Sequence, residues 1–279
     1  MSYRLRNWQQ RCWSWLRLQH ESRALKGHTH VSSGVVYIAT GHDYIVAAAM
    51  SIGSLRRVYR GNVMLLTDTN VSYLSKLSKY LDVDVLVHGT KEAHAGRSSR
   101  ILKTQVASLC PYSSAIFLDA DTLVFKPIDA LWKAPTAAKP IAMTTGLKHP
   151  TVGTLNDPQL FARPDIRFAE EYKLTLAAAG PDAPYYSSST MSWKRTPELL
   201  ELFRVWHQEW SRIRVSDMPA LARALAITGV GVVLLSSCFN ARDKLKSDTV
   251  IFTARSARMR PVYEKFPELY KTVNELLRG

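Results

Sequence analysis

The sequence predicts an α/β domain in which helices flank a mostly parallel sheet. Between residues 35 and 125, short apolar runs alternate with stretches of helical periodicity, the pattern of successive strand and helix units. Of the 279 residues, 46% are hydrophobic and 22% are charged, which excludes disordered, collagen-like and disulfide-stapled chains. At this length a folded chain buries roughly three quarters of its extended surface, enough for one substantial core.

The first half of the chain divides into strand and helix units in order. A β-branched run predicts a strand at residues 35–39, and the turn at residues 40–43 leads into apolar helical spacing over residues 44–55. Further strands are predicted at residues 63–66, 83–87 and 115–118, with helices over residues 71–81 and 102–109 between them.

The second half is less regular. Eight prolines between residues 126 and 189 predict long ordered loops around short strands instead of helices. Thr196-Pro197-Glu198 combines a capping hydroxyl, a first-turn proline and an acid, which indicates a helix start. Beyond it we predict a helix near residues 217–226, a buried strand at 231–235 and a C-terminal helix. Residues 224–241 lack formal charge, but their polar side chains disfavour a membrane span.

Residues 1–30 form a basic arm, with six Lys or Arg residues against one Glu. Leu5, Trp8, Cys12, Trp15 and Leu16 fall on one side of a helix. Such a helix either lies in the headgroup layer of an anionic membrane or packs on its own domain or a partner subunit. We therefore divide the chain into this arm, a main domain over residues 31–260 and a C-terminal helix over residues 261–279.

The charge balance and the cysteines indicate which partners and which cellular compartment to expect. The chain has 37 Lys and Arg residues against 23 Asp and Glu, and this excess attracts nucleic acid, anionic lipid or phosphorylated molecules. Three widely spaced cysteines argue against a disulfide framework or a zinc site, and they fit a reducing cytoplasm. The N-terminus has no apolar core followed by a small-residue cleavage site, so a secretory signal is not predicted.

The segment Asp119-Ala120-Asp121 carries the clearest chemistry. It follows the apolar strand at residues 115–118 and precedes another apolar run, so the carboxylates are expected on the floor of a cleft. In extended backbone, residues i and i+2 point the same way, and two adjacent like charges favour a cation. Mg²⁺ and Mn²⁺ take one or two carboxylates and complete their shell with water and phosphate oxygens. Open α/β sheets bind ligands at this edge.

These segments together resemble the nucleotide-sugar glycosyltransferases of the GT-A fold, a single Rossmann-like domain. The likeness is closest to the retaining family that includes glycogenin and bacterial lipopolysaccharide galactosyltransferases. It runs in order from about residue 34 to about residue 242. The segments that carry it are YIATGHDY at 37–44, SIGSL at 51–55, LLTD at 65–68, RILK at 100–103, DAD at 119–121 with IDALW at 128–132, and DMPAL at 217–221.

The resemblance implies a role for each candidate site residue. Thr40 and Tyr44 would hold the nucleoside; the alternatives are a helix cap for Thr40 and a core position for Tyr44. Arg100 and Lys103 would meet the diphosphate or an aspartate of the pair; the alternative is a solvated basic face that also includes Arg97.

Further roles concern the metal, the sugar and the reacting centre. Asp119 and Asp121 would bind Mn²⁺ or Mg²⁺, with Asp119 and Ala120 also contacting the diphosphate. Asp217 would act at the reacting sugar, or else serve as a helix N-cap. The donor-sugar segment is expected at Ser187, Ser188 and Ser189.

Three positions depart from the family pattern. Ser187-Ser188-Ser189-Thr190 stands where the family has Asn-Ser-Gly-Val, and Met218 follows Asp217 where the family has Gln. A third metal ligand, a histidine, is expected around residues 251–255, where this chain offers Thr253. The chain therefore either uses a different donor and a looser metal shell or has lost activity.

The resemblance implies a metal-dependent hexosyltransferase that uses a UDP-sugar and acts on a hydroxyl of a glycan or lipid-linked acceptor, with retention of configuration. The expected location is cytoplasmic, at the inner membrane face if the arm binds lipid. One alternative is a non-catalytic GT-A-like protein that binds a nucleotide sugar or a partner chain. A nucleic-acid binder ranks last, because the sequence shows no recognised nucleic-acid module, and no nucleic-acid partner is expected.

Overall fold

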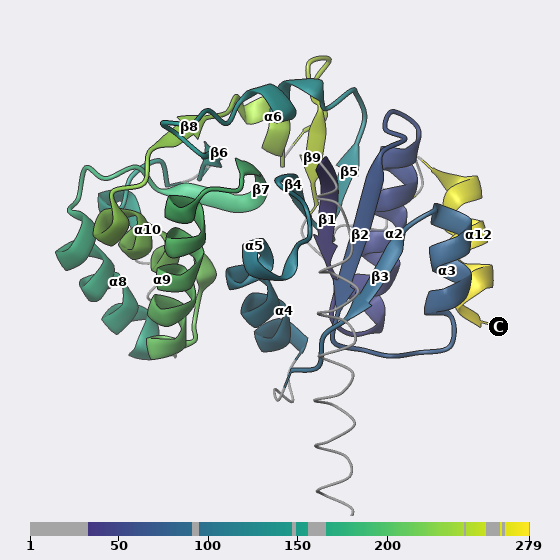
Figure 1. Ribbon diagram of the computed structural model, residues 1–279, viewed down its shortest axis with the longest axis horizontal. Coiled ribbons are helices and arrows are strands. Elements are labelled where there is room, and N and C mark those ends of the chain that lie inside the picture. The colour runs from purple at the N-terminus through teal and green to yellow at the C-terminus, as the bar shows by residue number, and fades with distance from the viewer. Residues whose placement is uncertain are drawn as a thin grey trace, which may run out of the picture.

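The computed structural model describes residues 33–90, 95–146, 149–155, 166–242, 244–254, 263 and 266–278. Within these residues, seven strands form a mixed sheet in the order β3-β2-β1-β4-β7-β6-β8 (Figure 1). The strands are β1 (Ser33–Ile38), β2 (Asn62–Thr67), β3 (Asp84–Val87), β4 (Ser114–Asp119), β6 (Ile141–Thr145), β7 (Tyr186–Lys194) and β8 (Val232–Leu234). Two further strands, β5 (Thr122–Val124) and β9 (Ile251–Thr253), pair separately.

The direction of the strands determines which polar segments meet. Strands β1 to β4 are parallel, β7 runs antiparallel between β4 and β6, and β8 is parallel to β6. The amino end of β7 therefore lies at the same sheet edge as the carboxyl ends of β1, β4 and β6. This arrangement confirms the predicted α/β fold with a mostly parallel sheet.

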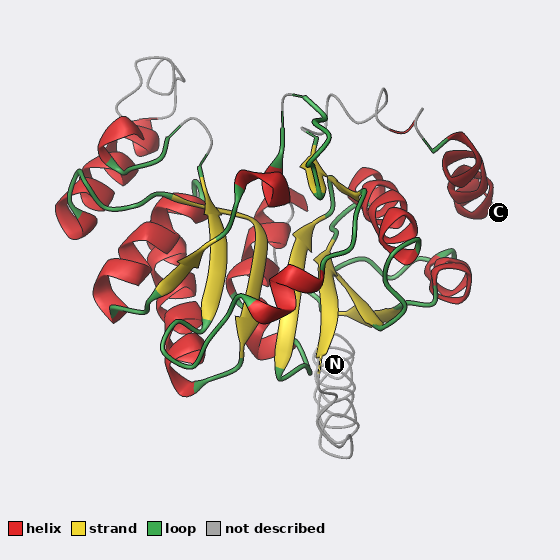
Figure 2. Cartoon of the chain, turned by 90° about the horizontal axis from the view of Figure 1, so that it is seen from above, coloured by secondary structure: helices red, strands yellow, loops and turns green. Residues whose placement is uncertain are grey.

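Helices cover both faces of the sheet (Figure 2). Alternate residues of β1 point to opposite faces: Val35 and Tyr37 join one apolar core, and Val36 and Ile38 join the other. The helices are α2 (His42–Arg56), α3 (Leu74–Leu81), α4 (Ala95–Thr104), α5 (Val106–Leu109), α6 (Asp129–Lys133), α8 (Ile166–Ala179), α9 (Pro197–Ile213), α10 (Asp217–Thr228) and α12 (Pro267–Arg278), with 3₁₀ turns at Gly153–Leu155 and Ser237–Asn240.

Two predictions for the second half are wrong. Helix α8 lies in the proline-rich region where loops were expected, because the prolines stand outside its 14 residues and leave its hydrogen bonds intact. The strand at 231–235 exists as β8, but it is the exposed edge of the sheet, and Leu234 is 62% exposed. In addition, the predicted helix over 102–109 is divided at Gln105 into α4 and α5.

The C-terminal helix α12 packs against α2 and α3, on the right of Figure 1. Gly53 permits this contact, since a Cβ there would lie 2.6 Å from the side chain of Leu269. The basic arm at residues 1–30 lies outside the described residues, so its helix and the proposed domain boundaries stay predictions. No helix in the described part of the chain is long and apolar enough to cross a membrane.

Candidate active site

Asp119 and Asp121 lie on a tight turn where the chain leaves the main sheet. Asp119 ends β4, Ala120 and Asp121 form the turn, and β5 continues away to pair with β9. The segment is therefore not extended as predicted. The Thr122 hydroxyl donates to the Asp119 carbonyl at 2.8 Å, and the Ala254 N–H donates to the Asp121 carbonyl at 2.9 Å. These bonds hold both ends of the turn.

Lys103 joins this turn to the start of α10. Its Nζ lies 2.8 Å from Asp119 Oδ1 and 3.4 Å from Asp217 Oδ2, and the residue is 7% exposed. Arg100, one helical turn earlier on α4, is more exposed and places its Nε 4.0 Å from Asp217 Oδ1. Because Lys103 is buried, the alternative of a solvated basic face is wrong for that residue. Strand β4 and helices α4 and α10 thus contribute to one cluster.

Asp217 is fixed by groups from several elements. Its Oδ2 accepts a hydrogen bond from the Ser188 hydroxyl at 2.7 Å, and its carbonyl accepts one from Trp206 Nε1 at 2.7 Å. The preceding N–H, that of Ser216, donates to Glu171 Oε2 at 3.1 Å. Ser216 is the N-cap residue of α10, so the N-cap alternative for Asp217 is wrong.

The three serines are buried on β7 beside an irregularity in the sheet. Between β6 and β7 the pairing shifts from Met143↔Met191 to Thr144↔Ser187. This bulge directs Ser188 to Asp217, while the Ser187 and Ser189 hydroxyls interact with each other at 3.3 Å. Ser187 Oγ also accepts a hydrogen bond from Asn240 Nδ2 at 2.9 Å. Its hydroxyl is therefore already engaged within the protein.

Thr40 and Tyr44 follow β1 at the same edge of the sheet. Ile38 is the register partner of Asp119, so the turn after β1 begins beside the Asp119 turn. Thr40 is buried, and the N-cap of α2 is Gly41, whose φ of 77° suits glycine. Thr40 is not the cap, and Tyr44, at 40% exposed, is not a core residue.

The electrostatics of the cluster follow from burial and mutual charge. Burial raises the pKa of Asp121 to about 7, with the negative charge of Asp119 adding to the effect. Burial would raise the pKa of Asp217 too, but the charge of Lys103, the Ser188 hydroxyl and Arg100 together hold it below its usual range. Burial lowers the pKa of Lys103 less than Asp119 and Asp217 raise it. Lys103 is therefore a stable cation and Asp217 a stable carboxylate.

The side chains of this cluster provide only part of the ligand set that a hard divalent ion needs. Asp121 forms no ion pair within 4 Å among the described residues, so its carboxylate is available to a cation. No three His, Cys, Asp or Glu residues gather into a metal-binding group in the described chain. Thr253, at the expected third position, donates its hydroxyl to Asn240 Oδ1 at 2.8 Å. Two carboxylates, with water and phosphate oxygens, would satisfy Mg²⁺ or Mn²⁺.

Sequence reasoning missed three residues near the cluster. Glu171 is 1% exposed and contacts the start of α10; Asn240 is fully buried and bonds to Thr144, Ser187 and Thr253. Arg242 Nη2 donates to Ser187 and Ser189 at 3.3 and 3.1 Å. Polar residues beside apolar runs are the only sequence signal, and that signal is common on any surface.

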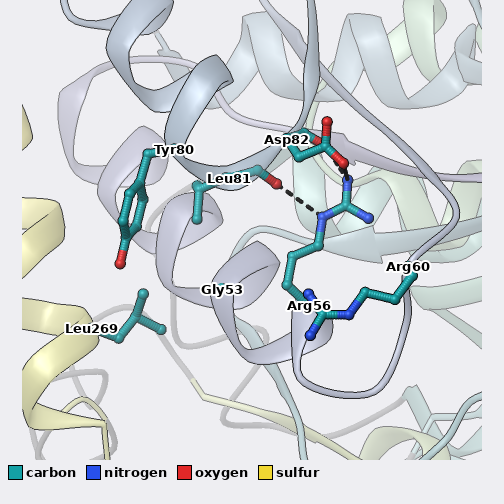
Figure 3. Close-up of a pocket in the computed structure, with 7 residues that line it drawn as sticks. All are labelled: Gly53, Arg56, Arg60, Tyr80, Leu81, Asp82 and Leu269. Atoms are coloured by element: carbon teal, nitrogen blue, oxygen red, sulfur yellow. Dashed lines mark hydrogen bonds and ion pairs between the residues drawn. The ribbon is translucent and has the colours of Figure 1, made fainter.

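A pocket between α2, α3 and α12 is unrelated to this cluster (Figure 3). It is lined by Gly53, Arg56, Arg60, Tyr80, Leu81, Asp82 and Leu269. Arg56 donates to the Leu81 carbonyl at 2.9 Å and also contacts Asp82, as the dashed lines in Figure 3 show. Its guanidinium thus caps the end of α3 and is committed to the fold.

The fold is that of the GT-A glycosyltransferases, as the sequence resemblance implied. Galactosyltransferase LgtC, solved with donor and acceptor sugar analogs, matches at a TM-score of 0.59 and 12% identity over 86% of this chain and 95% of LgtC. Mouse xyloside xylosyltransferase 1 matches at 0.52 and 12% identity, over 80% of this chain and 97% of the enzyme.

GlyE of Streptococcus pneumoniae TIGR4 gives a TM-score of 0.57 at 12% identity, over 88% of this chain and 63% of GlyE. No protein-family model matches the sequence, and a search of curated proteins finds no match. Similarity at this level of identity shows the fold, and function has to be argued from the site.

Proposed function

We propose that this protein is a metal-dependent glycosyltransferase that moves a sugar from a nucleoside diphosphate, most simply UDP, to a hydroxyl of a glycan or lipid-linked acceptor. The observation that carries the proposal is the bridge from Lys103 to Asp119 and Asp217, at the sheet edge where open α/β folds bind ligands. Lys103 holds two carboxylates from distant segments together at this edge, so the polar groups are in place before a ligand arrives.

Residues of this chain can stabilise both the leaving diphosphate and the reacting sugar. When the sugar leaves, negative charge grows on the diphosphate, and Lys103 is a fixed cation beside it. The anomeric carbon becomes cationic, and Asp217 presents a carboxylate that stays ionised. Ser188 donates to that carboxylate and Trp206 to the backbone carbonyl of the same residue, so the side chain is already positioned before the reaction. The likeness to retaining enzymes favours retention of configuration.

Asp119 and Asp121 would hold Mn²⁺ or Mg²⁺, which supplies further neutralisation of the diphosphate when bound. Thr40 and Tyr44, at the neighbouring strand end, are proposed to contact the nucleoside, and Ala120 to pass close to the phosphates. Ser188 and Ser189 are proposed to face the sugar, with Ser187 supporting them from behind.

A UDP-release assay tests this proposal. The wild-type chain should release UDP from a UDP-sugar in the presence of Mn²⁺, and Asp121→Ala should abolish the release. Asp129→Ala, a change to an acid of helix α6, serves as the matched control and should retain activity.

A second candidate, a non-catalytic binder of the same donor, is favoured by the committed Thr253 hydroxyl and by Met218, which packs in an apolar cluster. Donor binding without UDP release would support this candidate and contradict catalysis. Absence of both binding and release would contradict the two candidates together.

A further inference from the structure

Arg242 lies beside Ser187 and Ser189, and the residues that the structure describes give it no acidic partner. Its Nη2 donates to the hydroxyls of Ser187 and Ser189 at 3.3 and 3.1 Å. Its Nε is buried and has no hydrogen-bond partner among the described residues. The described residues also place no carboxylate within ion-pair distance of it. The guanidinium is therefore only partly satisfied.

An arginine in this state is costly to the fold. A guanidinium presents five N–H donors in a planar fork, and a buried donor without a partner costs the free energy of its lost hydration. Ser187 is already bonded to Asn240, so the fold gains little from the additional contact. A buried polar group without a partner in a native structure needs a reason, and a functional role such as binding a ligand is one of them.

Arg242 lies close enough to Asp121 for its charge to act on that carboxyl. No ion pair within 4 Å joins the two residues in the part of the chain that the structure describes. The unpartnered Nε of Arg242 and the Asp121 carboxyl, which has no ion pair among the described residues, are the groups of this site that an anion and a cation would complete. Planar forks of this type bind phosphate and carboxylate through two parallel hydrogen bonds.

We propose that Arg242 forms an oxyanion subsite that binds an anionic group of the sugar-nucleotide donor. The inference rests on the proposed function and adds a second cation to Lys103, whose charge also serves Asp119 and Asp217. The oxyanion has two sources: the diphosphate, common to all such donors, or a carboxylate on the transferred sugar. Because Arg242 contacts Ser187 and Ser189, which belong to the proposed donor-sugar segment, we favour the second source, the carboxylate of a uronic acid.

Calorimetric titration tests the subsite with three probes: UDP, UDP-glucose and UDP-glucuronic acid, each with Mn²⁺. The proteins are the wild-type chain, Arg242→Gln, Arg242→Lys and the control Arg204→Gln, whose arginine is exposed on α9. Loss of a charged hydrogen-bonded pair should weaken binding by roughly ten- to a hundred-fold in Arg242→Gln. The affinity of Arg242→Lys should lie between those of the wild-type chain and Arg242→Gln, because lysine keeps the positive charge and lacks the planar fork of N–H donors.

The pattern of loss identifies the oxyanion. Equal weakening of all three probes supports the diphosphate, and weakening confined to UDP-glucuronic acid supports the sugar carboxylate. Unchanged affinity for all three in Arg242→Gln and Arg242→Lys overturns the inference and leaves the proposed function intact. Failure of the wild-type chain to bind any of the three overturns the proposed function, and the inference with it.

Thermal unfolding separates a binding role from a structural one. Because Arg242 is incompletely satisfied, its replacement by Gln should leave the midpoint unchanged or raise it while affinity falls. A lower midpoint with undiminished affinity in Arg242→Lys would show that the residue serves the fold, and would contradict the subsite.

Discussion

Lys103 shows how one side chain can organise a site made from distant parts of the chain. Its ammonium contacts the carboxylates of Asp119 and Asp217, and it lies over the ring of Phe117 with 5.1 Å between Nζ and the ring centroid. The sequence indicated Lys103 and the aspartates because they stand in recognisable segments. It could not indicate the buried Glu171 or the partly buried Arg242, because nothing in their local sequence distinguishes such a group from a surface charge.

Replacing Lys103 by Met should therefore reduce both stability and donor binding. Two partly buried carboxylates would lose their cation, and the free energy of unfolding should fall by about 3 kcal/mol, the lower end of the range for a broken buried pair. Denaturant unfolding measures the loss, with the exposed Lys133→Met as the control. An unchanged unfolding midpoint would show that Lys103 does not compensate these carboxylates.

At the scale of elements, helices α8, α9 and α10 pack together and set the position of Asp217. Arg223 of α10 donates to Glu209 Oε2 of α9 at 2.7 Å and to Thr175 Oγ1 of α8 at 2.7 Å. The pattern Thr196-Pro197-Glu198 correctly predicted the start of α9, since a cap depends on local chemistry. Helix α8 was missed because its stability comes from this packing, which no local pattern encodes.

Glu171 of α8 should make stability depend on pH. Burial raises its pKa to about 7 against the opposing charge of Arg223. The folded state then keeps the proton up to about pH 7, whereas the unfolded chain releases it near the ordinary value of 4.5. The free energy of unfolding should consequently fall by roughly 3 kcal/mol as pH rises between these values.

Glu171→Gln cannot lose a proton and should flatten this part of the profile. The measurement is urea unfolding at several pH values between 5 and 8, with the exposed neighbour Glu170→Gln as control. Identical slopes in Glu171→Gln and the wild-type chain would refute the raised pKa.

The cap of α9 gives a simpler test at the same scale. The Thr196 hydroxyl accepts a hydrogen bond from the Leu199 N–H at 3.2 Å. Thr196→Ala should lower the free energy of unfolding by about 1 kcal/mol, while Thr196→Ser should retain most of it. Equal stability of the two variants in thermal unfolding would mean that the cap contributes nothing.

On the scale of the whole molecule, the fold could be predicted from the sequence, although LgtC, a solved structure that shares it, is only 12% identical to this chain. The alternation of strands and helices fixed the parallel part of the sheet. The antiparallel β7 and the turn at residues 120–121 depend on pairings between distant segments, which a single sequence does not reveal.

The basic arm, which lies outside the described residues, makes a prediction for the whole chain. If residues 1–30 bind anionic lipid, the full chain should pellet with liposomes that contain phosphatidylserine, and a chain lacking residues 1–30 should stay in the supernatant. Neutral phosphatidylcholine liposomes serve as the control. Equal pelleting of the two chains would remove the membrane role of the arm.

The central claim is that the edge around Asp119, Asp121 and Lys103 binds a nucleoside diphosphate sugar together with a metal. Thermal unfolding of the wild-type chain with UDP-, GDP- and CMP-sugars, each with and without Mn²⁺, tests it most directly, because a ligand that binds the folded state raises the midpoint. We predict that a UDP-sugar raises the midpoint with Mn²⁺ present and that Asp121→Asn abolishes the rise. The claim is contradicted if no nucleotide sugar raises the midpoint, or if the rise is the same without metal and in Asp121→Asn.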